Sequence, residues 1–267
     1  MLFGVALIVT FVYSSAFLFE GYRFLFHSDD AVKSVLANEA FREGRFVPRY
    51  WTYANGDLLF LTPYFFIILL HPFLGLGYLA NEVSCWLGFV YLLLCVCGLC
   101  RVTAPDHPRA AIVATTLAAS GLSAANYEFV VGQGAYSIYS GLALALFGLA
   151  VLRARDDQIS SPRAAQLVLA FLGATLVTSA NAQRAVVTVF LPLFAGWIAA
   201  RTMQVPRRRI LDPVIAALLA GAAAGCGIYY AYLLPSVLNV QAAASMTLAP
   251  LGTMLAHALL LPLAWFE

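Results

Sequence analysis

The sequence predicts an all-α polytopic membrane protein with about eight transmembrane helices, and three observations lead to this fold class. Of the 267 residues, 62% are hydrophobic and only 10% are charged, and the mean hydropathy is +0.85. A soluble globular domain averages about 45–50% apolar and about 25% charged residues. The apolar residues also form long unbroken runs, whereas the strands of a membrane β-barrel alternate in polarity. Composition and pattern therefore exclude both of these classes.

The first apolar run, 2–26, is expected to be a permanent membrane helix. It has no basic leader and no cleavage site of small residues, both of which a removable signal peptide requires. Seven further runs approach the roughly 20 apolar residues that cross a bilayer core. They are the segments 83–100, 110–125, 135–152, 164–180, 185–200, 210–234 and 250–266.

The run 58–79 is apolar as well, but its composition does not suit a straight crossing helix. Pro63, His71 and Pro72 interrupt it, and two glycines follow. Because proline breaks helical hydrogen bonding, we expect a re-entrant or surface-lying segment here. The first external loop then extends over about residues 27–80 and contains juxtamembrane helices.

The arginines predict the orientation of the helices. Short basic loops usually lie in the cytoplasm, and pairs of apolar runs separate three such links. These links contain Arg101 and Arg109; Arg153, Arg155 and Arg163; and Arg201, Arg207, Arg208 and Arg209. We therefore expect a cytoplasmic amino terminus and external polar links near 126–134, 181–184 and 235–249. Orientation accounts for the basic links, so no nucleic-acid partner is expected.

The external loop begins with a predicted helix over residues 29–43. Ser28 is a suitable cap, acidic residues favour a first turn, and Gly44 is a suitable stop. Such a helix would lie along the membrane surface. Its predicted apolar face contains Val32, Val35, Leu36 and Ala40 with Phe41 at the edge, and its polar positions are Lys33, Asn38, Arg42 and Glu43.

Asp29 and Asp30 at the start of this helix have two interpretations, and the residue types leave both open. They are consistent with simple capping of the helix. Alternatively, a partly desolvated carboxylate at the bilayer rim can act as a general base, and carboxylates can bind a divalent cation such as Mg²⁺ or Mn²⁺. Adjacent residues point apart on a helix, so the two are expected to have different tasks.

This order of features resembles a known family. The features are, in order, an amino-terminal membrane helix, an acidic pair directly after it, a juxtamembrane helix and the proline-initiated aromatic run TPYFFIILLHPFLGLGYLANEV. In this order they are similar to the membrane glycosyltransferases of the GT-C superfamily. That superfamily includes protein mannosyltransferases and aminoarabinose transferases. Its members move a sugar from a polyprenyl-phosphate carrier to an acceptor on the outer side of the membrane. The likeness covers about residues 1–110 and extends over the rest by topology alone.

The resemblance implies roles for the acidic residues. Asp29 matches the family's catalytic base and Asp30 the second acidic residue of the loop, and Glu128 in the next external link is a further catalytic candidate. A tentative metal site would use Asp29 and Asp30. Glu128 also has a plain structural interpretation as an interfacial helix end.

Arg184 is the main candidate for binding the substrate phosphate, because it stands in a link that has no other arginine. A planar guanidinium can bind a lipid phosphate through two hydrogen bonds, although it can equally extend to lipid headgroups. Arg49 has the same two interpretations. Further predicted substrate-binding residues are Tyr53, Asn55, Asp57 and Gln133.

The sequence thus predicts a single GT-C-like transmembrane module over 1–267, an enzyme that transfers a sugar at the external face. Its partners would be a polyprenyl-phosphate-linked sugar, a glycan, lipid or protein acceptor, and membrane lipids. The inner (plasma) membrane of a bacterium, with a periplasmic active site, is the expected location. The alternatives are a transporter or flippase for a lipid-linked substrate and a non-catalytic assembly subunit. The chain ends in LLLPLAWFE within an apolar run, so further helices or an external domain are expected beyond it.

Overall fold

The structure is a computed structural model that describes residues 2–24, 28–54, 56–120, 127–134, 136–155, 164–202 and 212–241. These residues are mostly helical. Four helical stretches among them are long and apolar enough to cross a membrane: Leu2–Phe24, Tyr78–Thr103, Ala182–Ala199 and Pro213–Ser236. The prediction of a helical membrane protein is confirmed at this level.

Several of these stretches are composites of different helix types. Helix α1 (Leu2–Ala16) continues into the π-helical turn η1 (Phe17–Gly21) and the 3-10 turn η2 (Tyr22–Phe24). The other described helices are α2 (Ser28–Glu43), α3 (Tyr64–Leu74), α4 (Tyr78–Thr103), α5 (Pro108–Ala119), η3 (Tyr127–Gly132), α7 (Ser137–Arg155), α8 (Ala164–Ala180), α9 (Ala182–Ala185), η4 (Val186–Phe190), α10 (Leu191–Thr202), α11 (Asp212–Ile228), η6 (Tyr229–Leu233) and η7 (Leu234–Ser236).

Not all of the eight expected crossings have that length. Helix α5 has 12 residues and α8 has 17, and the apolar part of α7 is Ser137–Leu152. The expected run 250–266 lies outside the described residues. The structure therefore supports four spans by length and composition, together with shorter apolar helices.

The segment that was expected not to cross is a short helix in the structure. Helix α3 has 11 residues, contains Pro72 and ends at Gly75, whose φ of 66° is in the left-handed region. At 1.5 Å per residue it is roughly 16 Å long, about half of a hydrocarbon core. The interruption predicted from its prolines and glycines is thus confirmed in length.

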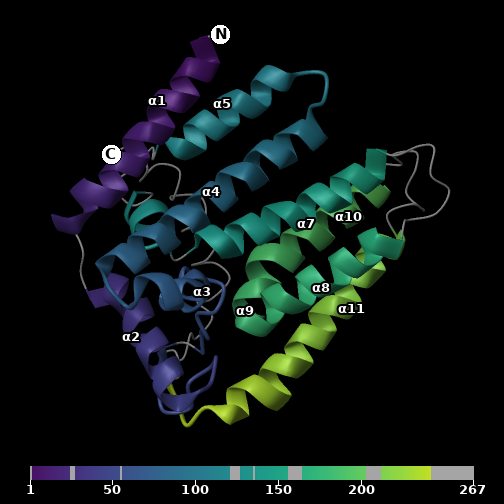
Figure 1. Ribbon diagram of the computed structural model, residues 1–267. Helices are drawn as coiled ribbons and strands as arrows, with labels where there is room; N and C mark the ends of the chain where they lie inside the picture. The colour runs from purple at the N-terminus through teal and green to yellow at the C-terminus, as the bar shows by residue number, and fades with distance from the viewer. Residues whose placement is uncertain are drawn as a thin grey trace, which may run out of the picture.

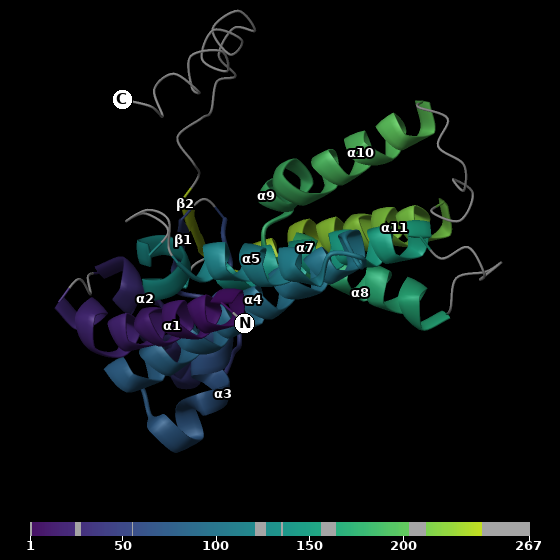
Figure 2. The ribbon, with the colours of Figure 1, turned by 90° about the horizontal axis from the view of Figure 1, so that it is seen from above.

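The helices lie side by side, and the links between them separate to two ends of the molecule (Figure 1). One end of the molecule contains the turn between α4 and α5 and the neighbouring ends of α7, α8, α10 and α11. Helix α2, the loop after it and α9 lie at the opposite end. Seen from above, α3 projects from the layer formed by α1, α4 and α5 (Figure 2). The helix ends beside the basic links thus lie apart from those beside the polar links, as expected.

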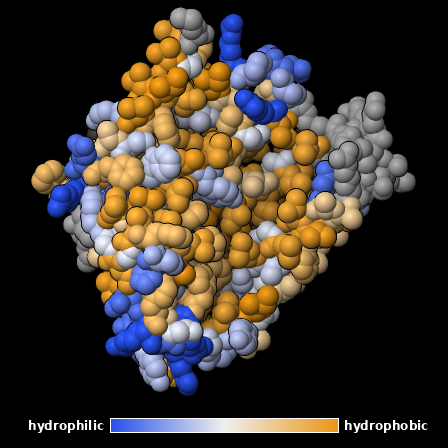
Figure 3. Space-filling model, in the orientation of Figure 1, coloured by the Kyte–Doolittle hydropathy of each residue, from blue (hydrophilic) through white to orange (hydrophobic). Residues whose placement is uncertain are grey.

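The surface shows the same division. Apolar side chains cover most of the visible face, and hydrophilic ones gather at the lower end, over α2 and its following loop, and at the upper end near the α4–α5 turn (Figure 3). Many of the exposed large residues are apolar, among them Leu2, Phe73 and Tyr232. Such a belt between two polar ends suits contact with lipid.

Small residues allow the closest helix contacts. At Gly225 of α11, an added Cβ atom would lie 2.6 Å from the Thr175 carbonyl oxygen and 2.6 Å from the Thr178 Cβ of α8. At Gly221, one turn earlier, it would lie 2.3 Å from the Phe171 carbonyl oxygen. Two glycines four residues apart are a common means of packing membrane helices. They hold α8 and α11 in contact along their length.

The loop after α2 pairs with the segment after η7 through a feature that the all-α prediction missed. Strands β1 (Thr52–Ala54) and β2 (Asn239–Gln241) form a short parallel pair. The Leu238 amide also donates to the Arg49 carbonyl oxygen at 2.9 Å. Parallel pairing joins segments far apart in sequence, and strands of three residues are too short to give a sequence signal.

Helix α2 has the predicted bounds, but its buried face differs from the predicted one. Lys33, Leu36, Ala37 and Ala40 are buried, whereas Val35 is half exposed. These four positions follow the spacing i, i+3, i+4 and i+7 of one helical face. Lys33, counted from the sequence among the polar positions of this helix, therefore lies on its buried face, because the helix packs on protein along this stripe.

Candidate functional site

Two predicted substrate-binding residues, Asp57 and Arg184, form an ion pair although they are far apart in sequence. Arg184 Nη1 lies 2.5 Å from Asp57 Oδ2. The Asp57 side chain is 17% exposed and that of Arg184 is 33% exposed, so the pair lies at the boundary between interior and surface. The structure thus brings the external loop and the link between α8 and α10 to one place.

A break between α8 and α9 positions Arg184. Asn181 is extended, with φ −160° and ψ 100°, and its Oδ1 accepts a hydrogen bond from the Arg184 amide at 3.0 Å. This is the bonding pattern of a helix N-cap. The Leu58 amide donates to the Ala180 carbonyl oxygen, the last of α8, at 3.3 Å. The break therefore anchors both partners of the ion pair.

The turn that presents Asp57 is strained. Gly56 has φ 65°, and Leu59 has φ 62°, the only positive φ of a non-glycine residue in the described chain. A left-handed conformation at a residue such as leucine costs about 1–3 kcal/mol and is often found at functional sites. The Tyr229 hydroxyl of η6 holds the turn by donating to the Gly56 carbonyl oxygen at 2.7 Å.

Aromatic and hydroxyl groups surround the guanidinium. The Cζ of Arg184 lies 5.5 Å from the centre of the Tyr136 ring, a cation–π contact. The hydroxyl groups of Tyr139 and Thr188 lie 3.2 Å apart, and Thr188 donates to the Arg184 carbonyl oxygen at 2.8 Å. Arg184 and Thr188 flank the start of the π-helical turn η4, and such turns are frequent at functional sites.

Burial dominates the electrostatics of Asp57. Desolvation raises the pKa of its carboxyl group above the ordinary value of an aspartate, and this effect outweighs the opposing influence of Arg184 and of the hydrogen bond from the Leu59 amide. The ionised form of Asp57 therefore depends on its partner arginine.

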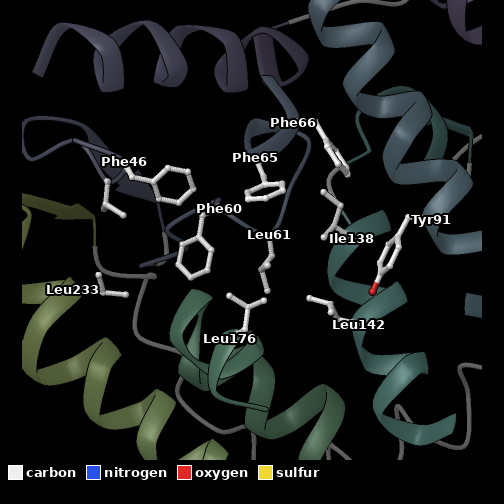
Figure 4. A pocket seen from close by; sticks show the side chains of 11 residues that line it. Phe46, Phe60, Leu61, Phe65, Phe66, Tyr91, Ile138, Leu142, Leu176 and Leu233 are labelled. Carbon is white, nitrogen blue, oxygen red and sulfur yellow. The ribbon is translucent and has the colours of Figure 1, made fainter. Parts of the chain in front are cut away.

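An apolar pocket of about 440 Å³ lies among the same segments. Its side chains come from the external loop, α3, α4, α7, α8 and η6, and they surround a common space (Figure 4). The lining residues are Phe46, Val47, Phe60, Leu61, Phe65, Phe66, Tyr91, Ile138, Leu142, Leu176 and Leu233. This volume and this lining are typical of a site for a small apolar ligand or for part of a lipid chain.

The pocket and the ion pair share their supporting segments. Phe60 follows Asp57 by three residues in the same loop, and Ile138 precedes Tyr139 on α7. Leu233 lies one turn after Tyr229, which holds the Asp57 turn. The apolar pocket and the ion pair are therefore built from the same loop and neighbouring helices, although neither Asp57 nor Arg184 lines the pocket.

A second polar cluster lies around the carbonyl oxygen of Gln133. Lys33 Nζ of α2 donates to this oxygen, and Cys85 Sγ of α4 donates to it at 3.5 Å. The Gln133 side-chain amide donates to Glu128 Oε1 at 3.5 Å. Lys33 is only 2% exposed, and a lysine is rarely buried to this extent unless it has a polar partner. The predicted residues Glu128 and Gln133 thus meet a lysine that the sequence interpretation counted only among the polar positions of its helix.

Two further polar residues of α4 are completely buried nearby. Asn81 Nδ2 donates to Glu82 Oε1 at 3.3 Å, and both side chains are 0% exposed. They belong to the first turns of α4, and Cys85 lies one turn after Glu82. The cluster therefore occupies the end of a membrane-crossing helix and not its middle.

A short turn connects the two clusters. Gln133 precedes Tyr136 by three residues, and Gly134 between them has φ 59°. A Cβ atom at Gly134 would lie 2.5 Å from Pro63 Cγ and 3.4 Å from the Cys85 Cα. This glycine lets the turn pass between the external loop and α4, so that one cluster continues into the other.

The remaining predicted site residues have different outcomes. Asp29 and Asp30 belong to α2, but their side chains lie outside the described part of the structure, as does Asn55. Tyr53 is buried and its hydroxyl donates to the Pro48 carbonyl oxygen at 3.0 Å. Arg49 is exposed, and its amide donates to Glu43 Oε2 at 2.6 Å. The contacts of Tyr53 and Arg49 stabilise the loop and lie apart from the two clusters.

The described side chains bring together no group of three histidine, cysteine or acidic residues that could bind a metal ion. The predicted cation site at Asp29 and Asp30 is outside this search. A divalent cation at that position stays a prediction.

The sequence interpretation missed several residues of these clusters. Asn81 and Glu82 stand directly before the apolar run 83–100, in the first turns of a helix long and apolar enough to cross a membrane, and an ionisable residue in such a helix is itself a signal of function. Lys33 has the spacing of the buried face of α2, which could have identified it. Tyr136, Tyr139 and Tyr229 give no signal in sequence, because only the fold brings them to Arg184, to Thr188 and to the Asp57 turn.

Comparisons with known proteins add no relative. No protein-family model, no curated protein and no solved structure matches the chain.

Proposed function

We propose that this protein is a membrane glycosyltransferase that moves a sugar from a polyprenyl-phosphate-linked donor to an acceptor at the external membrane face. The observation that carries the proposal is that one loop and its neighbouring helices supply both a partly exposed guanidinium, Arg184, and an apolar pocket. An amphiphilic donor has the same two parts, an anionic phosphate and a hydrocarbon chain.

Arg184 suits the phosphate because a guanidinium offers several fixed N–H donors. One of them contacts Asp57, and the side chain remains one-third exposed. Asn181 and Tyr136 support its backbone and its charged group. A group held in this way can bind an anion without a large loss of conformational entropy.

The apolar pocket suits the first part of the carrier chain. Aromatic and aliphatic side chains line it, and its lining includes Phe65, a residue of α3 that is partly exposed on the molecular surface. A chain entering beside this short helix would come from the lipid phase. The phosphate would then bind to Arg184, outside the apolar lining of the pocket.

The chemistry would be carried by the acidic residues at this end of the molecule. In the proposed reaction Asp29 takes the proton of the acceptor hydroxyl, and Glu128 and Asp30 assist it. The hydroxyl oxygen attacks the sugar carbon, and the bond to the phosphate oxygen breaks. Eight crossings, a cytoplasmic amino terminus and an inner-membrane location with this face outside are part of the same proposal.

A transporter or flippase is the competing function. It requires charged residues that line a path through the middle of the membrane. The buried charged residues described here, Lys33 and Glu82, belong to a loop helix and to the first turns of α4. Their position at one end favours a site at the membrane surface over a path across it.

The test is a comparison of transfer and transport in liposomes that contain the purified protein. Transfer is measured with a radiolabelled polyprenyl-phosphate sugar, and transport by the accessibility of a fluorescent analogue to external dithionite. We expect transfer without transport. Asp29→Asn is expected to reduce transfer by about 10²-fold or more, the contribution of a general base, and Arg184→Gln by about 10²-fold.

Matched controls have the same chemical changes at the opposite end of the molecule. Asp106→Asn and Arg101→Gln alter exposed residues of the α4–α5 turn, and both are expected to keep full transfer. All variants must reach the membrane in equal amounts. Retained transfer in Asp29→Asn would refute the catalytic role of this residue, and transport without transfer would replace the proposed function by its competitor.

A further inference from the structure

The contact between Asp57 and Arg184 raises a chemical question, because a neutralised guanidinium is a poor site for a second anion. The contact uses one oxygen of the carboxylate and one nitrogen of the guanidinium, Oδ2 and Nη1. A two-point contact, the strongest geometry for such a pair, is not formed. The other carboxylate oxygen, Oδ1, accepts only a long hydrogen bond of 3.3 Å from the Leu59 amide among the described contacts.

The turn that contains Asp57 has the properties of a segment with two arrangements. Gly56 before the aspartate and Leu59 after it both have a left-handed backbone conformation. The conformation of Leu59 is strained. Hydrogen bonds hold the backbone of the turn: the Tyr229 hydroxyl donates to the Gly56 carbonyl oxygen, the Asp57 amide to Ala54 and the Leu58 amide to Ala180. With the backbone held, the Asp57 carboxylate can leave Arg184 by rotation of its own side chain.

The charges around Asp57 favour exchange with a stronger anion. The groups that face it are Arg184 from α9, Tyr139 from α7 and Tyr229 from η6. Arg184 is the one fully charged group among these three, so an approaching anion competes with Asp57 for the same guanidinium. A phosphate group offers more acceptor oxygens than a carboxylate and matches the guanidinium fork.

We propose that Asp57 is an exchangeable counter-ion, whose carboxylate neutralises Arg184 until the phosphate ester of an amphiphilic ligand takes its place. The apolar pocket, which the same loop and neighbouring helices form, receives the hydrocarbon part of that ligand. This inference rests on the phosphate-binding role of Arg184 in the proposed function and is independent of sugar transfer. When it leaves the arginine, Asp57 gains a proton, because burial already favours its neutral form.

The exchange has a measurable consequence for affinity. While Asp57 neutralises Arg184, only a fraction of the molecules is competent to bind an anion, and the apparent affinity falls by that fraction. Removal of the carboxylate charge therefore increases the affinity for a phosphate ester. A purely structural ion pair predicts the reverse, because its loss would misplace Arg184.

The experiment measures binding of octyl phosphate to the full chain in detergent, by isothermal titration calorimetry. We expect Asp57→Asn to bind about tenfold more tightly than the unmodified chain, with Asp57→Ser as a second variant of the same kind. Asp106→Asn, the same change at an exposed position in the α4–α5 turn, leaves the affinity unchanged. Circular dichroism and gel filtration confirm that each variant is folded.

The dependence on pH provides a second signature. As the pH falls through the raised pKa of Asp57, its carboxylate becomes neutral and Arg184 is released. The affinity of the unmodified chain for octyl methyl phosphate, a diester with a constant charge in this range, then rises. The affinity of Asp57→Asn stays constant over the same range.

The outcomes separate this inference from the proposed function. Weaker or equal binding by Asp57→Asn, with loss of binding in Arg184→Gln, would refute the exchange and leave the phosphate site in place. Undiminished binding by Arg184→Gln would refute both. Inorganic phosphate is measured in parallel: a shift with the octyl esters alone supports a lipid headgroup as ligand, and the same shift with inorganic phosphate supports a free phosphate.

Discussion

Single hydroxyl groups hold the candidate site together, and Tyr229 is the clearest case. Its hydroxyl donates to the Gly56 carbonyl oxygen across more than 170 positions of sequence, and its side chain is buried. A buried carbonyl oxygen that loses its donor costs stability. The turn around Asp57 thus depends on an atom of η6.

We expect Tyr229→Phe to lower the stability by about 1 kcal/mol, because the Gly56 carbonyl oxygen loses its hydrogen bond while the ring stays in place. Thermal unfolding in detergent measures this change. Tyr232→Phe is the matched control, since Tyr232 is 72% exposed in the same segment, and it is expected to leave stability unchanged. Equal effects of both variants would contradict the role given to Tyr229.

At this scale the sequence predicts residue types better than residue contacts. Asp57 and Arg184 were both expected to bind substrate, but their ion pair depends on the break at Asn181 and on the return of the loop to α8. Lys33 was counted among the polar positions of its helix and not on the predicted apolar face. Its burial follows from the position of α2 against protein rather than lipid, which one helix alone does not determine.

The membrane helices are held by steric fit, and the contact of α8 with α11 shows how. Thr175 Oγ1 donates to the Gly221 carbonyl oxygen at 3.1 Å, which requires that the two helices approach closely. Without a hydrophobic driving force between helices in lipid, such packing is the main source of association. The glycines of α11 are therefore structural residues.

We expect Gly225→Ala to lower the stability by about 1–3 kcal/mol, because the added methyl group would overlap with α8. Gly227→Ala on the same helix is the matched control: nothing lies within 4 Å of its added Cβ atom. The control is expected to be neutral or to stabilise the helix by up to about 1 kcal/mol. Chemical unfolding in mixed micelles compares them, and a loss of stability in Gly227→Ala as large as that in Gly225→Ala would argue against steric packing.

The sequence predicted which helices exist better than it predicted where they begin and end. The helix after Ser28 and the interruption of the 58–79 run follow from local signals, a glycine stop and two prolines. The pairing of β1 with β2 and the π-helical turns η4 and η6 have no such signal, because they arise from contacts between distant segments. By length and composition the described residues contain four candidate crossing helices, and the apolar parts of α5, α7 and α8 are shorter.

In the whole molecule the few charged residues are informative, because they divide between two opposite ends. Polar residues gather at the two ends of an apolar body (Figure 3). One end has the turn with Arg101 and Arg109, and the opposite end has α2, the external loop and the ion pair of Asp57 with Arg184 (Figure 1). Both polar clusters and the apolar pocket belong to this second end, which is where we place the function.

The central claim is that this end binds a lipid phosphate, with its chain in the apolar pocket and its phosphate on Arg184. A polyprenyl phosphate with a diazirine in its first isoprene unit tests it most directly, by photo-crosslinking in liposomes and peptide mapping. We predict labelled peptides that contain Phe60–Phe66 and Leu176, and loss of this labelling in Arg184→Gln but not in Arg101→Gln. Labelling confined to the lipid-facing surface of α1 or α10, or labelling indifferent to Arg184, would contradict the claim.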